Sequence, residues 1–361
     1  MKKILIYLLI GVSFISQSCI NDNEDPVAIP KSDGSVVNPT VGGATQPNQV
    51  WFDLGTDTEI VTRRTDWDLG FYSGTEFKVI LNPSIMMAAG KIANATNIDL
   101  VKESDVAALM NQVQVANFNP ANTIYIDDVT GNFPKGYTAI EDIKANESDN
   151  PIYLVNMGKE IFNGSVPAGS VTTGGDNRGW KKVQIVRQGD AYKVKFADLN
   201  ATSHNEVIIN KNPAYNYSFY SMKNKLAVSV QPEKKNWDLC FSVFVNTIAG
   251  AGSYIYADFL TINNVGGAGA YEVKVTAPAT GAEVFKNFKV TDIDQSKFIY
   301  NDQRVIGGNW REVGPSGYQV KGDVFYVIKD PEGYYFKLRF TRLTSESGER
   351  GFPQFEYKPL F

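Results

Sequence analysis

Few side chains in this sequence could bind a metal-containing ligand. The chain has six methionines and a single histidine. Methionine sulfur and histidine nitrogen can both take an axial position on haem iron. A methionine beside alanine or isoleucine more often fills space in a core, however, and spacing alone selects no pair of ligands. The candidate haem ligands are Met86, Met87, Met157, Met222 and His204.

The residue patterns of common enzyme classes are absent from the sequence. A Ser-His-acid hydrolase or a zinc site with several histidines would have to be built around His204 alone. There is no nucleophile elbow, Walker loop or HExxH pair, and the glycine runs at 250–252 and 266–269 lack phosphate-loop spacing. We therefore predict that the protein is not an enzyme and has no metal site of its own. We expect His204 in an exposed hairpin loop.

The first residues have the pattern of a targeting segment. Two lysines precede the apolar residues 4–15, a stretch too short to span a bilayer, and small residues then lead to Cys19. This pattern resembles a bacterial lipoprotein signal, with residues 1–18 removed and Cys19 acylated. The alternative is an ordinary secretory signal with an incidental cysteine.

The segment that follows, residues 19–49, is rich in Asn, Asp, Pro, Gly, Ser and Thr. We predict a flexible stalk that holds the folded part away from the membrane. The acidic residues 21–25 resemble the surface-export signals of Bacteroidetes lipoproteins, although they are also compatible with a solvated tether. Together these features predict an outer-membrane lipoprotein that is lipid-anchored and exposed at the cell surface.

Charge and cysteine content limit the partners and the covalent links. Removal of the two signal lysines would take the formal net charge from −4 to −6, which disfavours nucleic acid as a partner. Only two cysteines are present, so acylation of Cys19 would leave Cys240 without an intramolecular disulfide partner. Cys240 stands in an apolar run and is expected to be a small buried core residue.

A short motif occurs twice. Trp67-Asp68-Leu69 returns as Trp237-Asp238-Leu239, and each copy is followed far downstream by a similar aromatic hairpin, at 183–196 and 325–340. The shared order of two matching elements predicts one module written twice. We expect each Trp to fill the interior of its module.

The predicted fold class is all-β, with two tandem, related modules of twisted antiparallel sheet at residues 50–210 and 211–361. Aromatic-rich runs bounded by Gly, Pro, Asn and Asp are typical of strands and hairpins. The clearest strand candidates are 183–186, 192–196, 207–209, 226–230, 254–260, 271–275, 324–328, 335–340 and 352–357. Apolar periodicity predicts short helices at 104–113 and 138–145, both as insertions in the first module.

The C-terminal half carries a resemblance to a known family. Its motifs are Ile306-Gly307-Gly308-Asn309-Trp310-Arg311, Val324-Phe325-Tyr326-Val327-Ile328-Lys329-Asp330, Lys337-Leu338-Arg339-Phe340-Thr341 and Gly348-Glu349-Arg350-Gly351-Phe352-Pro353-Gln354-Phe355-Glu356-Tyr357, preceded by the second Trp-Asp-Leu copy. These residues resemble the HmuY-like haem-binding lipoproteins of Bacteroidetes, well over 217–361 and more loosely over 50–210. The resemblance implies a twisted-sheet surface lipoprotein that captures haem or a related porphyrin and passes it to a TonB-dependent outer-membrane receptor.

The sequence departs from that family at an expected ligand position. Characterised members bind haem iron with paired His or Met side chains on loops, and Arg311 stands where one such ligand would fall. Arg311 could instead pair with a haem propionate, or cap the sheet beside Trp310. The competing hypothesis is a surface lipoprotein that binds glycans or proteins through exposed aromatics such as Trp51, Trp180 and Trp310.

Overall fold

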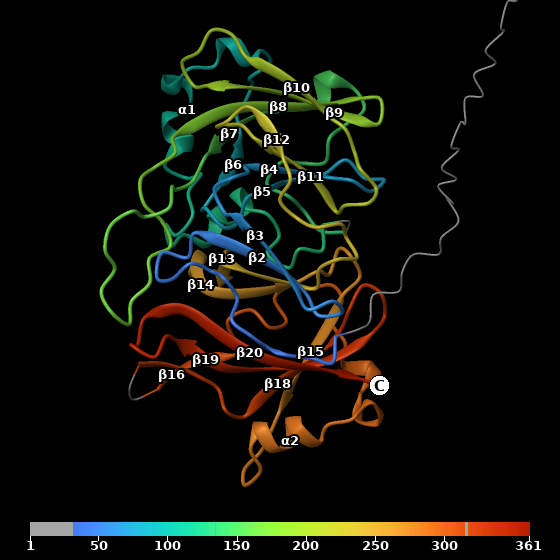
Figure 1. Cartoon of the computed structure of the whole chain (residues 1–361). Coiled ribbons are helices and arrows are strands. Elements are labelled where there is room, and N and C mark those ends of the chain that lie inside the picture. The colour runs from blue at the N-terminus through green and yellow to red at the C-terminus, as the bar shows by residue number, and fades with distance from the viewer. Residues whose placement is uncertain (1–31, 134, 315–316) are drawn as a thin grey trace, which may run out of the picture. The chain divides into compact units, whose positions relative to one another are not determined.

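The computed structural model describes residues 32–361 except 134 and 315–316. The expected signal peptide, Cys19 and residues 20–31 of the expected stalk lie outside the described residues. The stalk prediction is wrong for residues 32–49, because Val36–Val37 form a strand, Val41 and Gln46 are buried, and a second strand begins at Asn48. Most of the regular structure is antiparallel β, which confirms the predicted fold class (Figure 1). In the part of the chain that is described, no helix is long and apolar enough to cross a membrane.

Among the described residues the strands form two five-stranded sheets, two four-stranded sheets and one small ribbon. One five-stranded sheet has the order β1 (Val36–Val37), β20 (Arg350–Leu360), β19 (Tyr335–Thr344), β18 (Val324–Lys329), β15 (Gly269–Lys274). The other has the order β10 (Asn205–Ile209), β9 (Ala191–Asp198), β8 (Trp180–Gln188), β7 (Ile152–Asn156), β6 (Ala88–Lys91). The four-stranded sheets have the orders β12 (Leu226–Val228), β11 (Tyr217–Ser221), β4 (Leu69–Tyr72), β5 (Val79–Leu81) and β14 (Gly252–Ile262), β13 (Leu239–Ile248), β2 (Asn48–Asp53), β3 (Thr58–Arg63). The ribbon pairs β16 (Arg311–Gly314) with β17 (Gly317–Val320). All the strand candidates from the sequence fall within or overlap these strands.

Each four-stranded sheet combines strands of both repeats. Hairpin β2–β3, which precedes the first Trp-Asp-Leu, pairs with β13, which begins at the Leu of the second copy. Hairpin β11–β12, which precedes the second copy, pairs with β4, which begins at the Leu of the first. The registers correspond, because Phe52 faces Leu239 while Tyr220 faces Leu69. The two repeats therefore exchange their first hairpins.

The duplication extends to the polar contacts around each motif. The amide nitrogen Nδ2 of Asn82 donates to the carbonyl oxygen of Trp67 (2.8 Å), and that of Asn263 donates to the carbonyl oxygen of Trp237 (2.9 Å). The backbone N–H of the Asp after each Trp donates across the exchange, from Asp68 to Tyr220 and from Asp238 to Phe52. The same local structure is thus built twice.

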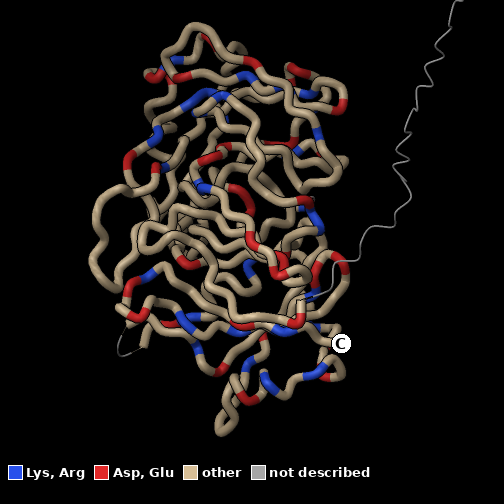
Figure 2. Tube along the Cα trace, in the orientation of Figure 1, with Lys and Arg blue, Asp and Glu red and all other residues tan. Residues whose placement is uncertain are grey.

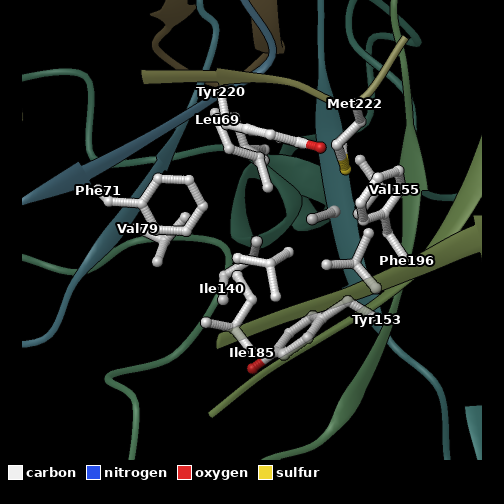
Figure 3. Close-up of a cluster of buried hydrophobic side chains, with 14 of the residues drawn as sticks. Leu69, Phe71, Val79, Ile140, Tyr153, Val155, Ile185, Phe196, Tyr220 and Met222 are labelled. Carbon is white, nitrogen blue, oxygen red and sulfur yellow. The ribbon is translucent and has the colours of Figure 1, made fainter. Parts of the chain in front are cut away.

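The core of the first repeat lies between a five-stranded and a four-stranded sheet. Leu69 and Phe71 of β4 meet Val155 of β7 and Phe196 of β9, with Tyr220 supplied by the second repeat (Figure 3). Trp67, which precedes β4, lies instead in a central aromatic cluster with Trp51, Phe219 and Trp237. Both motif tryptophans are buried, as expected. Cys240 is also buried and belongs to this central cluster, as expected.

The helices are short. They are α1 (Glu103–Met110), α2 (Gly281–Asn287) and the 3₁₀ turns η1 (Ile98–Leu100), η2 (Pro120–Tyr125), η3 (Glu147–Asp149), η4 (Val290–Asp292) and η5 (Gln295–Lys297). The first predicted helix is confirmed as α1. Helix α2 was not predicted, although Thr280 and Glu283 form a capping box that marks its start.

The predicted helix at 138–145 is wrong. Ile140 and Ile143 are buried in the core of the first repeat, and the segment runs extended along β5. Ile140 forms a bridge with Val79, and the Ile143 N–H donates to the carbonyl oxygen of Phe77 (2.9 Å). Tertiary pairing therefore overrides the helical periodicity of the sequence.

Acidic and basic residues are interspersed along the strands and loops (Figure 2). On the outer five-stranded sheet of the first repeat, Lys193 pairs with Glu206 (3.1 Å) and Lys195 with Glu147 (2.5 Å). On that of the second repeat, Arg339 pairs with Glu356. These partly exposed ion pairs contribute little stability individually.

Candidate ligand-binding site

Three of the methionines proposed as haem ligands lie in the core of the first repeat. Their exposed fractions are 2% for Met87, 1% for Met157 and 0% for Met222. Figure 3 shows the Met222 side chain among Tyr220, Val155 and Phe196. In this conformation a haem iron cannot reach these three sulfurs without displacing core side chains.

His204 lies in the loop between β9 and β10, as expected, but its side chain is only 22% exposed. Its Nδ1 is 2.9 Å from Asp99 Oδ1, and its Nε2 is 3.3 Å from Glu206 Oε1. Both ring nitrogens therefore face carboxylates. Iron ligation by this imidazole would have to break one of these contacts.

Met86 is placed differently from its neighbour Met87. It lies in the loop between β5 and β6, is partly exposed, and lines a cavity of about 280 Å³. Met110, the last residue of α1, lines the same cavity. Two thioether side chains, one from the β5–β6 loop and one from the end of α1, thus reach one pocket.

The backbone of Met86 is strained. Its φ angle is +66°, in the left-handed region that long side chains rarely adopt. Such strain costs on the order of 1–3 kcal/mol and is concentrated at functional sites, where the surrounding structure maintains it. The conformation turns Met87 into the core and leaves Met86 at the cavity.

The loop between β7 and β8, residues 157–179, holds this conformation in place. Gly158 has φ +75°, and a Cβ there would lie 1.9 Å from the carbonyl oxygen of Ile85, so no larger residue fits. The backbone N–H of Lys159 donates to that same oxygen (2.7 Å). Further along the loop, an ideal Cβ on Gly174 would lie 3.8 Å from Met86 Sδ.

A buried ion pair anchors the end of the loop. Arg178 Nη1 is 2.7 Å from Asp68 Oδ1, and the two side chains are 1% and 0% exposed. Arg178 Nη1 also donates to the carbonyl oxygen of Met157 (3.0 Å), and Arg178 Nε is 3.3 Å from Glu160. The Asp of the first Trp-Asp-Leu copy therefore fixes the loop that covers Met86.

The rest of the cavity wall combines aromatic, amide and cationic groups. Trp180 begins β8 and is half-buried, and Lys159 Nζ donates to Asn177 Oδ1 (2.6 Å). Two thioethers, an indole and an ammonium suit a planar apolar ligand that carries an acidic group. The volume is slightly below the roughly 300–1,000 Å³ of ordinary ligand pockets, so a macrocycle would enter by one edge.

The sequence did not select Met110 as a ligand. Met110 shares helical spacing with Val106 and Leu109, a pattern typical of a core-facing stripe, and α1 does bury Val106. The packing of α1 against β7 brings the Met110 side chain to the cavity.

Arg311 lies away from this cavity, at the start of the β16–β17 ribbon. Its Nη2 donates to the carbonyl oxygen of Ala257, and its guanidinium lies 5.8 Å from the ring centroid of Trp310 and 5.9 Å from that of Tyr318. Burial lowers the pKa of Arg311. The geometry joins Arg311 to the second repeat's aromatic residues.

Two of the three tryptophans expected as exposed stacking platforms are core residues. Trp51 is 4% exposed and Trp310 is 1% exposed, so the expectation is wrong for both. Trp51 packs on Trp237 in the central aromatic cluster, and Trp310 stacks on Phe340 in the core of the second repeat. Trp180 remains partly exposed at the Met86 cavity.

The fold and cavity define a duplicated, mainly antiparallel β protein with a methionine-lined pocket in its first repeat. A family model described as HmuY protein matches residues 45–217 and again residues 210–357, so it covers both repeats. The chain belongs to the HmuY protein family. This confirms the family resemblance, and the two matches fit a tandem duplication.

Other comparisons add little. No curated protein matches the chain. A solved structure described as a crystal structure of apo PinO from Porphyromonas gingivitis is 14% identical, covers 50% of this chain and 95% of that chain, and has a TM-score of 0.17. At that score the similarity supports no argument about function.

Proposed function

We propose that this protein is a non-enzymatic surface lipoprotein that binds haem or a related porphyrin at the Met86–Met110 cavity. Membership of the HmuY family supports haem as the ligand. The observation that carries the site is the convergence of the two thioethers in one pocket, with Met86 held in a strained conformation. Lys159, on the same wall, is the proposed partner of a haem propionate.

The proposal extends to location and delivery. Acylation at Cys19 would anchor the protein in the outer membrane, and the residues between Cys19 and the folded part would tether it at the cell surface. Haem that enters its pocket by one edge stays accessible to a TonB-dependent outer-membrane receptor, which would take it up. A lipid analysis of the mature N-terminus tests the anchor independently of haem binding.

Titration with hemin tests the ligand. The expected result is a saturable Soret shift at micromolar concentrations for the purified protein. No saturable shift in either the ferric or the ferrous state would overturn haem binding.

Leucine substitutions test the site, because leucine keeps the volume and removes the sulfur. Met86→Leu and Met110→Leu are each expected to weaken hemin binding by about tenfold or more and to change the Soret position. Met222→Leu and His204→Ala are the matched controls and should leave both unchanged. If the Met86→Leu, Met110→Leu double variant still binds hemin, the proposed site is wrong, although haem remains the ligand.

The second candidate function is binding of a glycan or a protein at an aromatic surface. The observation that favours it is the pair Phe118 and Tyr254, whose ring centroids lie 6.1 Å apart. Phe118 is 62% exposed and Tyr254 is 38% exposed. Exposed aromatic pairs are typical of recognition surfaces. A glycan array or pulldown that gives binding lost in Phe118→Ser, while hemin gives none, would favour this function.

A further inference from the structure

A second cavity lies in the centre of the molecule, between the two exchanged four-stranded sheets. Its volume is about 100 Å³, and Trp51, Trp67, Phe133 and Trp237 contribute aromatic wall. It shares no lining residue with the Met86 cavity. A ligand there would contact both repeats.

Four polar side-chain atoms of this wall have no hydrogen-bond partner within the described protein. They are Tyr217 Oη, Gln231 Oε1, Trp237 Nε1 and Ser242 Oγ. Tyr217, Trp237 and Ser242 are 4%, 5% and 9% exposed. A buried polar atom without a partner is destabilising, and each one in a native structure calls for an explanation.

Comparison of the two repeats shows why Tyr217 Oη and Trp237 Nε1 have no hydrogen-bond partner. In the first copy, Trp67 Nε1 donates to Gln49 Oε1 at 2.7 Å. The exchanged hairpins place Tyr217 of β11 at the position that corresponds to Gln49 of β2. The corresponding bond from Trp237 to Tyr217 is not formed, and both atoms remain without a partner beside the cavity.

The unpartnered atoms specify the chemistry of an occupant. Trp237 Nε1 only donates and Gln231 Oε1 only accepts, whereas the hydroxyls of Tyr217 and Ser242 do both. An occupant therefore needs a group that both accepts and donates, which a hydroxyl does. Water would satisfy these atoms but leave the aromatic walls against water.

The size and charge of the cavity further restrict the class of ligand that it can bind. A dry cavity of about 150 Å³ in another protein binds benzene, so this one suits a single ring at most. Asp127 and Asp128 line the cavity, and the carboxylate of Asp128 disfavours an anion there. We propose that the central cavity binds one small neutral molecule that has a planar apolar body and a hydroxyl group, of the size of phenol.

Phenol is the probe, and benzene is the matched probe without the hydroxyl. In saturation-transfer NMR on the intact protein, phenol is expected to bind saturably with a dissociation constant below about 10 mM. The dissociation constant of benzene is expected to be at least about fivefold higher. Tyr217→Phe and Ser242→Ala remove unpartnered oxygens with little loss of packing, so each should fold. Each is expected to weaken phenol binding about fivefold and to leave benzene unchanged.

The control variants are Tyr326→Phe, a buried tyrosine outside this cavity, and Met86→Leu, in the haem pocket. Both should leave phenol binding unchanged, so the result is independent of the proposed haem function. Three outcomes would overturn the proposal: no saturable phenol binding, equal loss in the control variants, or a phenol-soaked crystal with only water in the cavity.

Discussion

The rings of Trp51 and Trp237 meet edge to face, with centroids 4.8 Å apart and planes at 82°. Trp51 belongs to hairpin β2–β3 of the first repeat, and Trp237 opens the Trp-Asp-Leu motif of the second. The contact has a counterpart in Trp67 and Phe219, also at 4.8 Å. Each motif tryptophan thus packs on a hairpin that comes from the other repeat, which joins the repeats into one folded unit.

The exchange predicts that the repeats depend on one another for stability. Residues 32–210 produced alone would lack the β11–β12 hairpin that completes their four-stranded sheet and contributes Tyr220 to their core. We expect each half alone to unfold at lower urea concentration than the intact protein, and the two halves to form a one-to-one complex when mixed. Size-exclusion chromatography and urea titration check this. Two stable halves that do not associate would contradict it.

The ion pair between Arg178 and Asp68 predicts a large stability effect. Both side chains are almost fully buried, so removal of one partner leaves an uncompensated buried charge. Arg178→Met is expected to lower the free energy of unfolding by about 3–5 kcal/mol. The control is Lys181→Met, which removes an ion pair with the 79% exposed Asp198 and should cost less than about 1 kcal/mol. Equal losses in urea titrations would refute the argument.

Gly158 predicts a steric effect at the proposed haem pocket. Gly158→Ala would combine left-handed strain with a clash against the Ile85 oxygen, whereas Gly169 has φ +77° and open space around the position of a Cβ. Gly169→Ala should therefore cost only the strain, about 1–2 kcal/mol. Gly158→Ala should cost clearly more and weaken hemin binding through Met86. Similar melting temperatures for the two variants would contradict this prediction and would mean that the backbone at residues 85–86 shifts to accommodate the added methyl group.

The buried carboxyl of Asp127 predicts a pH dependence of stability. Burial raises the pKa of Asp127 to about 7, while aspartate in an unfolded chain titrates near pH 4. Its contribution to stability is therefore complete below about pH 4 and is lost as the pH rises to about 7.

Asp127→Asn removes this titration, although it also disturbs the bonds that the carboxylate accepts from the Leu81 and Ala139 N–H groups. The stability of the variant relative to wild type should rise between pH 4.5 and pH 8, by up to about 1.4 kcal/mol per unit of pKa difference. Asp128→Asn is the neighbouring control. A relative stability that does not change with pH would show that Asp127 titrates normally.

The candidate site was only partly predictable. The sequence singles out Met86 and Met87 equally, because they are adjacent and share the same neighbours. The left-handed φ of Met86 separates them, and it depends on contacts with Gly158 and Lys159, far along the chain. Met110 was interpreted as a helix core residue because helical spacing does not distinguish a core from a pocket.

Local patterns in the sequence determined much of the fold. Alternating aromatic runs and turn residues predicted the strands. Both signals are local, because the two faces of a strand and the type of a tight turn are set by residues that are close in the sequence. The repeated Trp-Asp-Leu motif and its downstream hairpins revealed the duplication. The same patterns gave the family resemblance.

Only the tertiary structure decided how the two repeats are joined. Hairpins β2–β3 and β11–β12 have equivalent registers available on β4 and on β13, so the sequence does not state which partner each hairpin takes. The sequence also does not distinguish the two motif aspartates. Asp68 pairs with Arg178, whereas burial and the nearby Asp53 raise the pKa of Asp238 well above its usual value. Such differences arise from contacts between residues distant in sequence, and the identical tripeptides carry no trace of them.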